Sequence, residues 1–349
     1  MSGTSLDGID VAWIESDGQS EVATGPSLTM PYPDDFRERL RAILGKDEPA
    51  GEIAAVEAEL TQLHAETIDV FRRRHPEAAF DLIGFHGHTI WHRPAERRTR
   101  QIGDGALLAR LTGVDVIADF RTADVTAGGE GAPLAPLYHA ALAAALAKPV
   151  AVLNLGGVGN VTWIGPEPDD ILAFDTGPGN ALIDDWVRQQ AGRAADYGGA
   201  LAAAGQVSKP HVQRFLAAPY FARKPPKSLD RDAFRQSVPS RLGLADGAAT
   251  LTEMTAAAVA AARRHFPAPA REFLVCGGGR KNPAMMTALA RLLGVPVRPA
   301  EDAGWDGDGL EAQAFAYLAI RSLAGLPLSL PTTTGVPQPT TGGRLFRAT

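Results

Sequence analysis

The first ten residues of the chain bring together groups that can bind a phosphorylated ligand. Small or hydroxyl-bearing residues form most of this segment: Gly3, Thr4, Ser5 and Gly8. They predict a turn whose backbone N–H groups and two hydroxyls point to one place, which is how proteins bind phosphate oxygens without a lysine. Asp7 would repel phosphate unless a cation lay between them. One interpretation is therefore a nucleotide phosphate loop with a carboxylate that organises Mg²⁺ through water. The alternative is an ordinary hairpin turn before a strand over residues 9–14.

Three further glycine-rich turns follow strand-like runs. Residues 154–160 (Asn-Leu-Gly-Gly-Val-Gly-Asn) again precede an alternating strand, so they repeat the pattern of the first turn. This repeat predicts two similar halves of the chain, each with a phosphate-binding hairpin. Residues 173–180 end in Pro-Gly-Asn before a helix, where backbone N–H groups bind anions. Gly277–Gly279 would let the backbone lie flat against a base or ribose. Each turn alone is typical of any α/β protein, whereas four at strand ends favour a nucleotide site.

The composition limits the classes of protein that remain. The 349 residues are 45% hydrophobic and 21% charged, with a net charge of −6, so no basic surface for nucleic acid is expected. The single cysteine, Cys276, excludes an internal disulfide and a cysteine-based zinc cage, and we expect it to be a small buried hydrophobe. No apolar run approaches the ~20 residues of a membrane span. We therefore expect a cytoplasmic protein that does not bind membranes.

The order of the predicted elements indicates an α/β fold. Helices are predicted over residues 34–44, 53–70, 133–147, 181–190, 310–322 and from Asn282 onward, and strands over residues 81–85, 114–118, 149–155 and 161–164. We expect an N-terminal domain over residues 1–132 and a C-terminal domain over residues 133–329, with residues 330–349 packing back on the first. The segment 326–343 is rich in Pro, Thr and Gly and is expected to run over the surface.

The chain resembles the anhydro-N-acetylmuramic acid kinase family in a series of motifs that follow the family's order. These motifs are residues 1–8, 85–89, 119–124, 128–134, 154–157, 174–180, 225–228 and 311–316. The resemblance covers essentially the whole chain. It implies two ribonuclease H-like domains of the actin, Hsp70 and sugar-kinase type around a central nucleotide cleft. It also implies an ATP- and Mg²⁺-dependent homodimer that opens the 1,6-anhydro bond of 1,6-anhydro-N-acetylmuramic acid and phosphorylates O6, in peptidoglycan turnover.

The resemblance assigns the catalytic base to Asp124 in the motif Arg-Thr-Ala-Asp. An ionised carboxylate can accept the proton of a water that attacks the anomeric carbon. A second carboxyl group protonates the departing oxygen in most glycosidases, whereas here the γ-phosphorus would capture O6. The alternative role of Asp124 is that of a capping or turn acid. Five further residues are implied to face the sugar, with Gly129 beside them: His86, His88, Arg121, Gly128 and Glu311.

Several of these assignments have structural alternatives. Arg121 could instead make a structural ion pair, and Glu311 could complement a helix dipole. Family members generally have glutamine where this chain has His88. His86 and His88 alternate as on one strand face, which is weak evidence for a metal, so we interpret them as sugar contacts. Lys227 is expected near the cleft, or else in a solvated loop.

The nucleotide contacts follow from the same motifs. We expect ATP to bind at Gly3, Thr4, Ser5, Leu6, Asp7, Gly8, Ile9, Asp10, Asn154, Gly156, Gly157, Asp175, Gly177, Gly179, Asn180, Gly277, Gly278 and Gly279.

The residues of the chain also bear on three alternative functions. Another sugar or acyl kinase of the same fold is possible because fold does not determine substrate, and an ATP-driven binding module is a third option that the Asp124 motif disfavours. A dinucleotide dehydrogenase is disfavoured because no G-x-G-x-x-G opens a βαβ unit.

The strand over residues 9–14 would lack a neighbour on one side. We therefore expect an upstream start codon and an additional strand of about 5–10 residues before Met1.

Overall fold

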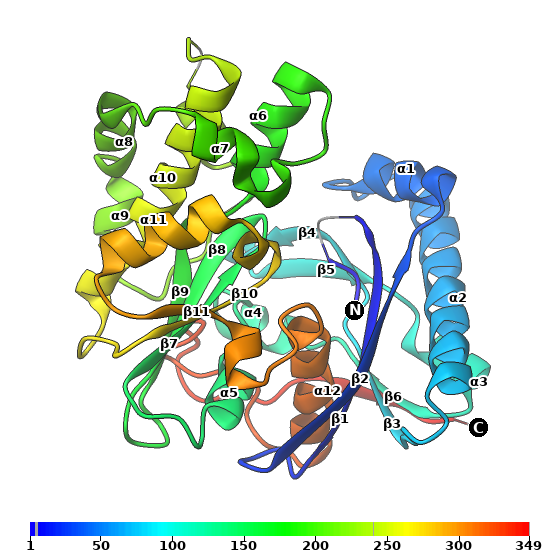
Figure 1. Ribbon diagram of the computed structural model, residues 1–349. Coiled ribbons are helices and arrows are strands. Elements are labelled where there is room, and N and C mark those ends of the chain that lie inside the picture. Colours follow the sequence, from blue (N-terminus) through cyan, green and yellow to red (C-terminus); the bar gives the residue numbers. More distant parts are fainter. Residues whose placement is uncertain (4–5, 240, 349) are drawn as a thin grey trace. The chain divides into compact units, whose positions relative to one another are not determined.

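The computed structural model describes residues 1–3, 6–239 and 241–348. It forms two compact units, Met1–Ala144 with Gly309–Thr349, and Ala145–Asp308 (Figure 1). The first unit extends further than the expected boundary at residue 132 because helix α5 (Pro136–Leu142) packs against helix α12 (Leu310–Leu323). Within this contact the fully buried Tyr138 donates a hydrogen bond to Gln313 over 3.0 Å. Both helices therefore belong to the unit of the N-terminus.

The second unit is built on one five-stranded sheet. Its strands are β7 (Val150–Leu155), β8 (Val158–Ile164), β9 (Ile171–Pro178), β10 (Phe273–Cys276) and β11 (Val297–Pro299). The order is β11-β10-β7-β8-β9, with β7, β8 and β9 antiparallel and with β10 parallel to both β7 and β11. In chain order this is 3-2-1-4-5, the ribonuclease H-like arrangement that the resemblance implied.

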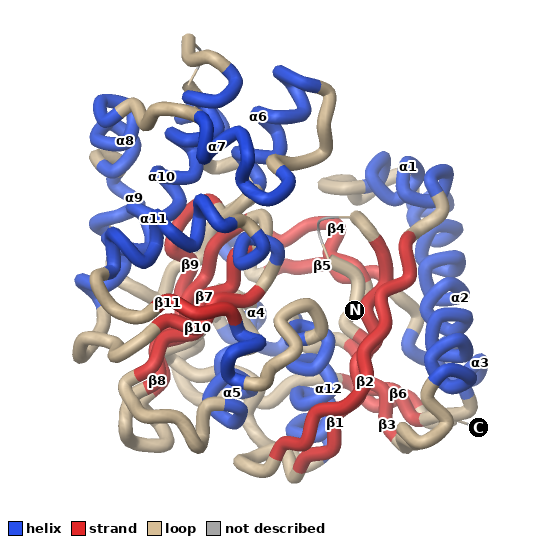
Figure 2. Tube along the Cα trace, in the orientation of Figure 1, coloured by secondary structure: helices blue, strands red, loops and turns tan. Residues whose placement is uncertain are grey.

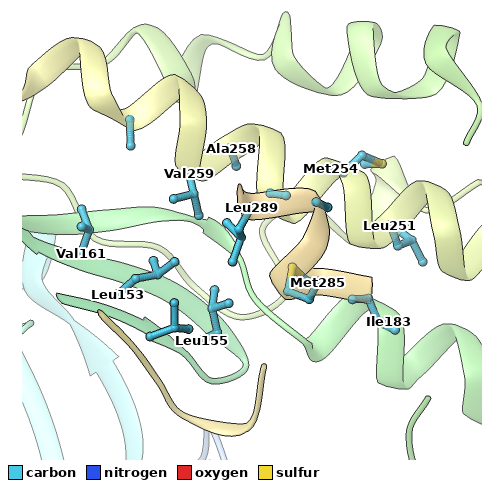
Figure 3. Packing of buried hydrophobic residues seen from close by; sticks show 14 of the residues in the cluster. Leu153, Leu155, Val161, Ile183, Leu251, Met254, Ala258, Val259, Met285 and Leu289 are labelled. Atoms are coloured by element: carbon cyan, nitrogen blue, oxygen red, sulfur yellow. The ribbon is translucent and has the colours of Figure 1, made fainter. Parts of the chain in front are cut away.

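Helices cover this sheet and bury the core of the second unit. They are α6 (Ala181–Ala191), α7 (Ala200–Ala204), α8 (Lys209–Leu216), α9 (Pro219–Ala222), α10 (Leu244–Ala262) and α11 (Pro283–Leu293). Figure 3 shows Leu153 and Val161 on the strands facing Val259 and Leu289 on the helices. The central strand β7 is buried along nearly its whole length, which explains its continuous apolar sequence.

In its described residues, the first unit contains three small sheets. β1 (Gly8–Ser16) pairs with β2 (Val22–Pro31), β3 (Leu82–Phe85) pairs in parallel with β6 (Asp115–Ala118), which also pairs with β12 (Arg344–Phe346), and β4 (His88–Arg93) pairs with β5 (Arg98–Ile102). The helices are α1 (Asp34–Ile43), α2 (Ala50–Arg74), α3 (Gly105–Thr112), α4 (Thr122–Ala127), α5 and α12. Within the described parts of the chain, no ladder joins β1 to β3. α12 packs against both of these strands (Figure 2).

The structure corrects two expectations for irregular segments. The helix expected over residues 133–147 is limited to α5, which begins at Pro136, because proline suits the first helical position. The segment 326–343 runs over the surface only in part, since residues 337–339 are exposed whereas Leu328, Thr334 and Val336 are buried. Its buried backbone is satisfied locally, because Thr333 both accepts a hydrogen bond from the N–H of Leu330 and donates one to its carbonyl.

Among the described residues, no helix has both the length and the apolar character that crossing a bilayer requires.

The contact between β3 and α12 leaves no room for a side chain at Gly84. A Cβ there would lie 2.3 Å from the carbonyl oxygen of Phe315, and backbone cannot move aside as a flexible side chain can. We expect Gly84→Ala to lower the free energy of unfolding by about 2 kcal/mol or more. Gly51→Ala in α2 is the control, because open space surrounds that position and alanine favours helix by up to ~1 kcal/mol. Urea unfolding of both variants checks this, and equal stabilities would contradict it.

Candidate active site

Asp124 lies in helix α4 and is held by a turn rich in glycine and by the C-terminal segment. Its side chain is 2% exposed. Oδ1 accepts a hydrogen bond from the N–H of Gly131 over 2.7 Å, and Oδ2 accepts one from the hydroxyl of Thr334 over 2.5 Å. A Cβ at Gly129 would lie 2.2 Å from Oδ1, so only glycine lets the turn pass the carboxylate. These contacts agree with the alternative role of Asp124 as an acid that stabilises the turn. They do not exhaust the carboxylate, because each ionised oxygen can accept a second hydrogen bond.

Thr334 is a residue of this cluster that sequence reasoning missed. It comes from the far end of the chain, and its carbonyl also accepts a hydrogen bond from the N–H of Glu130 over 2.6 Å. No spacing in the sequence links it to Asp124, because the two residues are 210 positions apart. The only available signal was three consecutive threonines, Thr332–Thr334, in a segment expected at the surface.

Arg121 and His86 form a second pair next to this turn. Arg121 Nε donates to His86 Nε2 over 2.9 Å, and Nη1 donates to the carbonyl of Gly131 over 2.7 Å. Because Nε2 accepts, the proton of a neutral His86 ring is on Nδ1, which lies 3.0 Å from the carbonyl of Gly87. Burial and the neighbouring guanidinium hold the pKa of His86 well below its usual value. Both ring nitrogens are thus engaged, and the geometry favours His86 as a group that orients Arg121.

His88 belongs to a different hydrogen-bond chain. The hydroxyl of Tyr32 donates to Ser2 Oγ over 2.5 Å, and Ser2 Oγ lies 2.7 Å from His88 Nδ1. If the Ser2 hydroxyl donates onward, the His88 proton is on Nε2, which is buried and has no hydrogen-bond partner among the described residues. His86 precedes strand β4 while His88 begins it, with Gly87 at φ +68° between them. The alternation in the sequence had suggested that the two rings are neighbours on one strand face, and this expectation is wrong.

Glu311 lies in the first turn of helix α12, where its carboxyl interacts electrostatically with Arg121, Asp10 and the amino group of Met1. Glu311 is exposed to solvent, although nearby protein displaces part of the water around its carboxyl. The loss of water raises its pKa, and Asp10 also raises it, while Arg121 and the amino group of Met1 lower it. Glu311 therefore has a position from which it could complement the dipole of α12. It also has charged residues of the expected site near its carboxyl.

The first glycine turn is a hairpin in its described part. Ser2 pairs with Ile9, and Asp10 exchanges both backbone hydrogen bonds with Met1 over 2.9 Å. Leu6 has φ +60° and donates its N–H to the carbonyl of Gly3 over 3.2 Å. Thr4 and Ser5 lie outside the described residues. The exposed Asp7 is on this hairpin, and a Cβ at Gly8 would lie 2.2 Å from the carbonyl oxygen of Met30.

The glycine turns of the second unit converge on residues 154–157. The N–H of Gly179 donates to the carbonyl of Gly157 over 2.9 Å, and that of Asn180 to the carbonyl of Gly156 over 2.7 Å. A Cβ at Gly277, whose φ is +73°, would lie 2.4 Å from Asn154 Oδ1. Three turns that are distant in sequence are therefore in contact. The N–H groups of Gly179 and Asn180, just before α6, therefore donate to carbonyls of the turn after β7.

Asp175 and Lys227 join two motifs within the second unit. The N–H of Asp175 donates to the carbonyl of Lys227 over 3.0 Å, and Asp175 Oδ2 accepts from the N–H of Leu229 over 2.7 Å. Lys227 is 2% exposed, and its Nζ lies 4.5 Å from the ring centre of Tyr220. Burial lowers the pKa of Lys227 to about 8. The solvated-loop alternative for Lys227 is therefore wrong, and the expectation of a buried Cys276 is confirmed.

The expected site residues divide between the two units. The first unit holds His86, His88, Arg121, Asp124, Gly128, Gly129, Glu311 and, of the first glycine turn, residues 1–3 and 6–10, and the second holds Asn154, Gly156, Gly157, Asp175, Gly177, Gly179, Asn180 and Gly277–Gly279. In the described part of the chain, no three His, Cys, Asp or Glu side chains are grouped so that they could hold a metal ion.

Comparison with known proteins identifies the family. The family model described as anhydro-N-acetylmuramic acid kinase matches residues 1–348. The anhydro-N-acetylmuramic acid kinase of Paramagnetospirillum magneticum is 56% identical over 99% of this chain and 97% of its own length. That of Rhodospirillum rubrum is 54% identical over 100% of this chain and 93% of its own. The protein is thus of the kinase class, on a mixed α/β fold. The chain belongs to the anhydro-N-acetylmuramic acid kinase family.

The burial of His88 makes the stability of the protein depend on pH. Burial lowers its pKa from 6.5 to about 4, so between these values the unfolded chain takes up a proton that the folded chain excludes. Stability is therefore lost as the pH falls below 6.5. In His88→Gln this contribution is absent. Below pH 6.5 the variant should gain, relative to the parent, up to about 1.4 kcal/mol of unfolding free energy per pH unit of acidification. Urea unfolding at pH 7.5, 6.5 and 5.5 measures it, and two parallel curves would contradict it.

Proposed function

We propose that this protein uses ATP to convert 1,6-anhydro-N-acetylmuramic acid into N-acetylmuramic acid 6-phosphate and ADP, as part of cell-wall recycling in the cytoplasm. The observation that carries the proposal is the match to the family over residues 1–348. In this proposal water bonds to C1 as the bond from C1 to O6 breaks, and O6 bonds to the γ-phosphorus as the bond to the β-phosphate oxygen breaks. The proton of the water passes to a base.

Asp124 is the proposed base. Its two hydrogen bonds, from Gly131 and Thr334, hold the carboxylate in one orientation, and a carboxylate oxygen has two acceptor sites. A positioned base contributes about 10²–10⁴-fold to such a step. Because the departing O6 is captured by phosphorus, no second carboxyl group is needed to protonate it.

The groups around Asp124 are proposed to bind the sugar. Arg121 supplies positive charge for a substrate carboxylate, and its contact with His86 fixes its direction. The buried Nε2 of His88, without a partner among the described residues, suits a sugar oxygen, as the amide of the family's glutamine would. Gly128, Gly129 and Glu311 complete the proposed sugar site.

The glycine turns are proposed to bind ATP and Mg²⁺. Mg²⁺ commonly keeps several waters and uses only one or two carboxylates besides phosphate oxygens. The exposed carboxylate of Asp7 fits such water-mediated binding, where the ion would offset the charge between carboxylate and phosphate. The remaining nucleotide contacts are proposed at residues 3–10, Asn154, Gly156, Gly157, Asp175, Gly177, Gly179, Asn180 and Gly277–Gly279. A homodimer that binds no nucleic acid belongs to the same proposal.

Isotope labelling tests the coupled reaction and the base together. With ATP, Mg²⁺ and the anhydro sugar in ¹⁸O water, we expect label at C1 of the product and none in its phosphate, measured by mass spectrometry. Asp124→Asn should lower turnover by ~10²-fold or more, because the amide cannot accept the proton, while circular dichroism and ATP binding stay unchanged. Label appearing only in phosphate would mean simple ATP hydrolysis. Near-parental turnover of the variant would exclude Asp124 as the base.

Thr334 is expected to act by positioning Asp124. Thr334→Val removes the hydroxyl donor and should lower kcat about 10-fold with little change in KM, whereas Thr334→Ser should restore most of it. The matched control is Thr333→Val, a buried neighbour in the same segment whose hydroxyl bonds to Leu330. If both valine variants lowered kcat equally, the effect would be one of general stability and the positioning role would be wrong.

A further inference from the structure

His92, a half-buried residue of strand β4, lies beside the turn that follows Asp124. Burial and the neighbouring charge of Arg121 hold the pKa of His92 below its usual value, so the ring is neutral near neutral pH. Its Nε2 lies 2.7 Å from the carbonyl oxygen of Glu130, and its Nδ1 lies 2.9 Å from the hydroxyl of Thr99 in β5. Because a carbonyl can only accept, the ring proton is on Nε2, and Nδ1 accepts from Thr99.

The hydrogen bonds behind His92 run in one direction. The amide Nε2 of Gln101 in β5 donates to the hydroxyl oxygen of Thr99 over 2.8 Å and to that of Thr89 over 3.1 Å. Since Thr99 accepts from Gln101, its own proton is directed at the ring of His92. The hairpin of β4 and β5 therefore fixes both the tautomer and the position of this ring.

The acceptor of His92 belongs to a peptide group that is held at both ends. The carbonyl of Glu130 accepts from His92. The N–H of the same peptide group, that of Gly131, donates to Asp124 Oδ1 over 2.7 Å. Because a peptide group is planar and trans, its C=O and N–H point in opposite directions. A donor at the carbonyl thus keeps the N–H directed at the carboxylate.

Gly131 gives this peptide group the freedom to turn over. Its φ is +67°, and glycine adopts positive and negative φ about equally readily. After such a rotation a carbonyl oxygen, instead of an N–H, would face the carboxylate of Asp124 and repel it. A side chain cannot prevent the rotation, because a Cβ at this position would lie 2.8 Å from Cε1 of His92. The orientation of the peptide group must therefore be fixed by hydrogen bonds.

The other backbone groups of this turn are bound by residues near Asp124. The N–H of Glu130 donates to the carbonyl of Thr334 over 2.6 Å. The carbonyl of Gly131 accepts from Arg121 Nη1 over 2.7 Å. His92 supplies the bond to the remaining carbonyl, that of Glu130, and it brings this bond from the hairpin of β4 and β5.

We propose that His92 is a positioning residue that locks the peptide group between Glu130 and Gly131, so that its N–H stays directed at the carboxylate of Asp124. This role rests on the proposed function of Asp124 as the base. A carboxylate that kept its place but lost this donor would no longer be held in one orientation toward the attacking water.

Hydrogen exchange of the Gly131 amide tests the lock in the protein without ligands. His92→Leu removes the donor and keeps a side chain that fills much of the same space. We expect the Gly131 amide to exchange at least ~10-fold faster in this variant, as measured by mass spectrometry with residue-level fragmentation. His92→Gln can place an amide N–H near the position of Nε2 and should keep exchange close to that of the parent. Unchanged exchange in His92→Leu would overturn the proposal.

Turnover tests whether the lock serves Asp124. In His92→Leu we expect kcat to fall about 10-fold with little change in KM for ATP or for the anhydro sugar, because a base acts in the transition state. His92→Gln should restore most of kcat. Parental kcat in His92→Leu despite faster exchange would overturn the positioning role.

Thr99→Val provides a milder variant that leaves His92 in place. It removes the hydroxyl that donates to Nδ1, so the ring is oriented less well, and we expect a smaller loss of kcat together with faster exchange at Gly131. If His92→Leu does not fold, these two measurements on Thr99→Val decide instead, and parental values of both would overturn the proposal.

Arg72→Met is the matched control. The half-buried Arg72 also donates from its side chain to a backbone carbonyl, that of Thr112 over 2.9 Å, but this bond joins α2 to α3. The variant should lower the melting temperature and leave kcat and the exchange of Gly131 at parental values. If it lowered kcat as much as His92→Leu, the effect would be one of general stability and the proposal would be wrong. A parent protein that forms no product would contradict the proposed function, whereas exchange at Gly131 would still decide the lock.

Discussion

The site of the first unit depends on one carboxylate that protein groups hold on both oxygens. Asp124 is almost fully buried, and it accepts hydrogen bonds from the glycine turn after α4 and from the C-terminal segment. A buried carboxylate without partners would be costly, so these contacts are a condition for its presence. They also connect α4 to the C-terminal segment, because a residue 210 positions away contributes one of the donors.

In the second unit, the expected site residues are held together by close contacts between backbone segments. The turn after β7, the turn before α6 and the triple glycine after β10 touch one another at distances where a Cβ would collide with a carbonyl or amide oxygen. Glycine is needed at Gly179 and Gly277 for this reason, rather than for flexibility. The surface that results is built from backbone, which suits a ligand such as a nucleotide that offers phosphate oxygens and a flat base.

The buried histidines show how the proposed sugar side combines stability with polarity. His86 is engaged through both nitrogens and supports Arg121, while His88 bonds to Ser2 through one nitrogen and has a buried second nitrogen. Burial keeps both rings neutral near neutral pH, so they act as directional hydrogen-bonding groups instead of charges. Keeping the two rings neutral lowers the stability of the protein in acid. It also leaves Arg121 as the main positive charge beside Asp124.

The sequence by itself determined the α/β class, most strands and helices, the glycine turns and the family, because these depend on local periodicity and on short motifs. The motif around Asp124 could be recognised for the same reason. Only the tertiary structure decided that Thr334 reaches Asp124, that His86 and His88 belong to different hydrogen-bond chains, and that Lys227 is buried between aromatic rings. These facts depend on contacts between segments far apart in the chain, and no local pattern encodes which buried polar groups will meet.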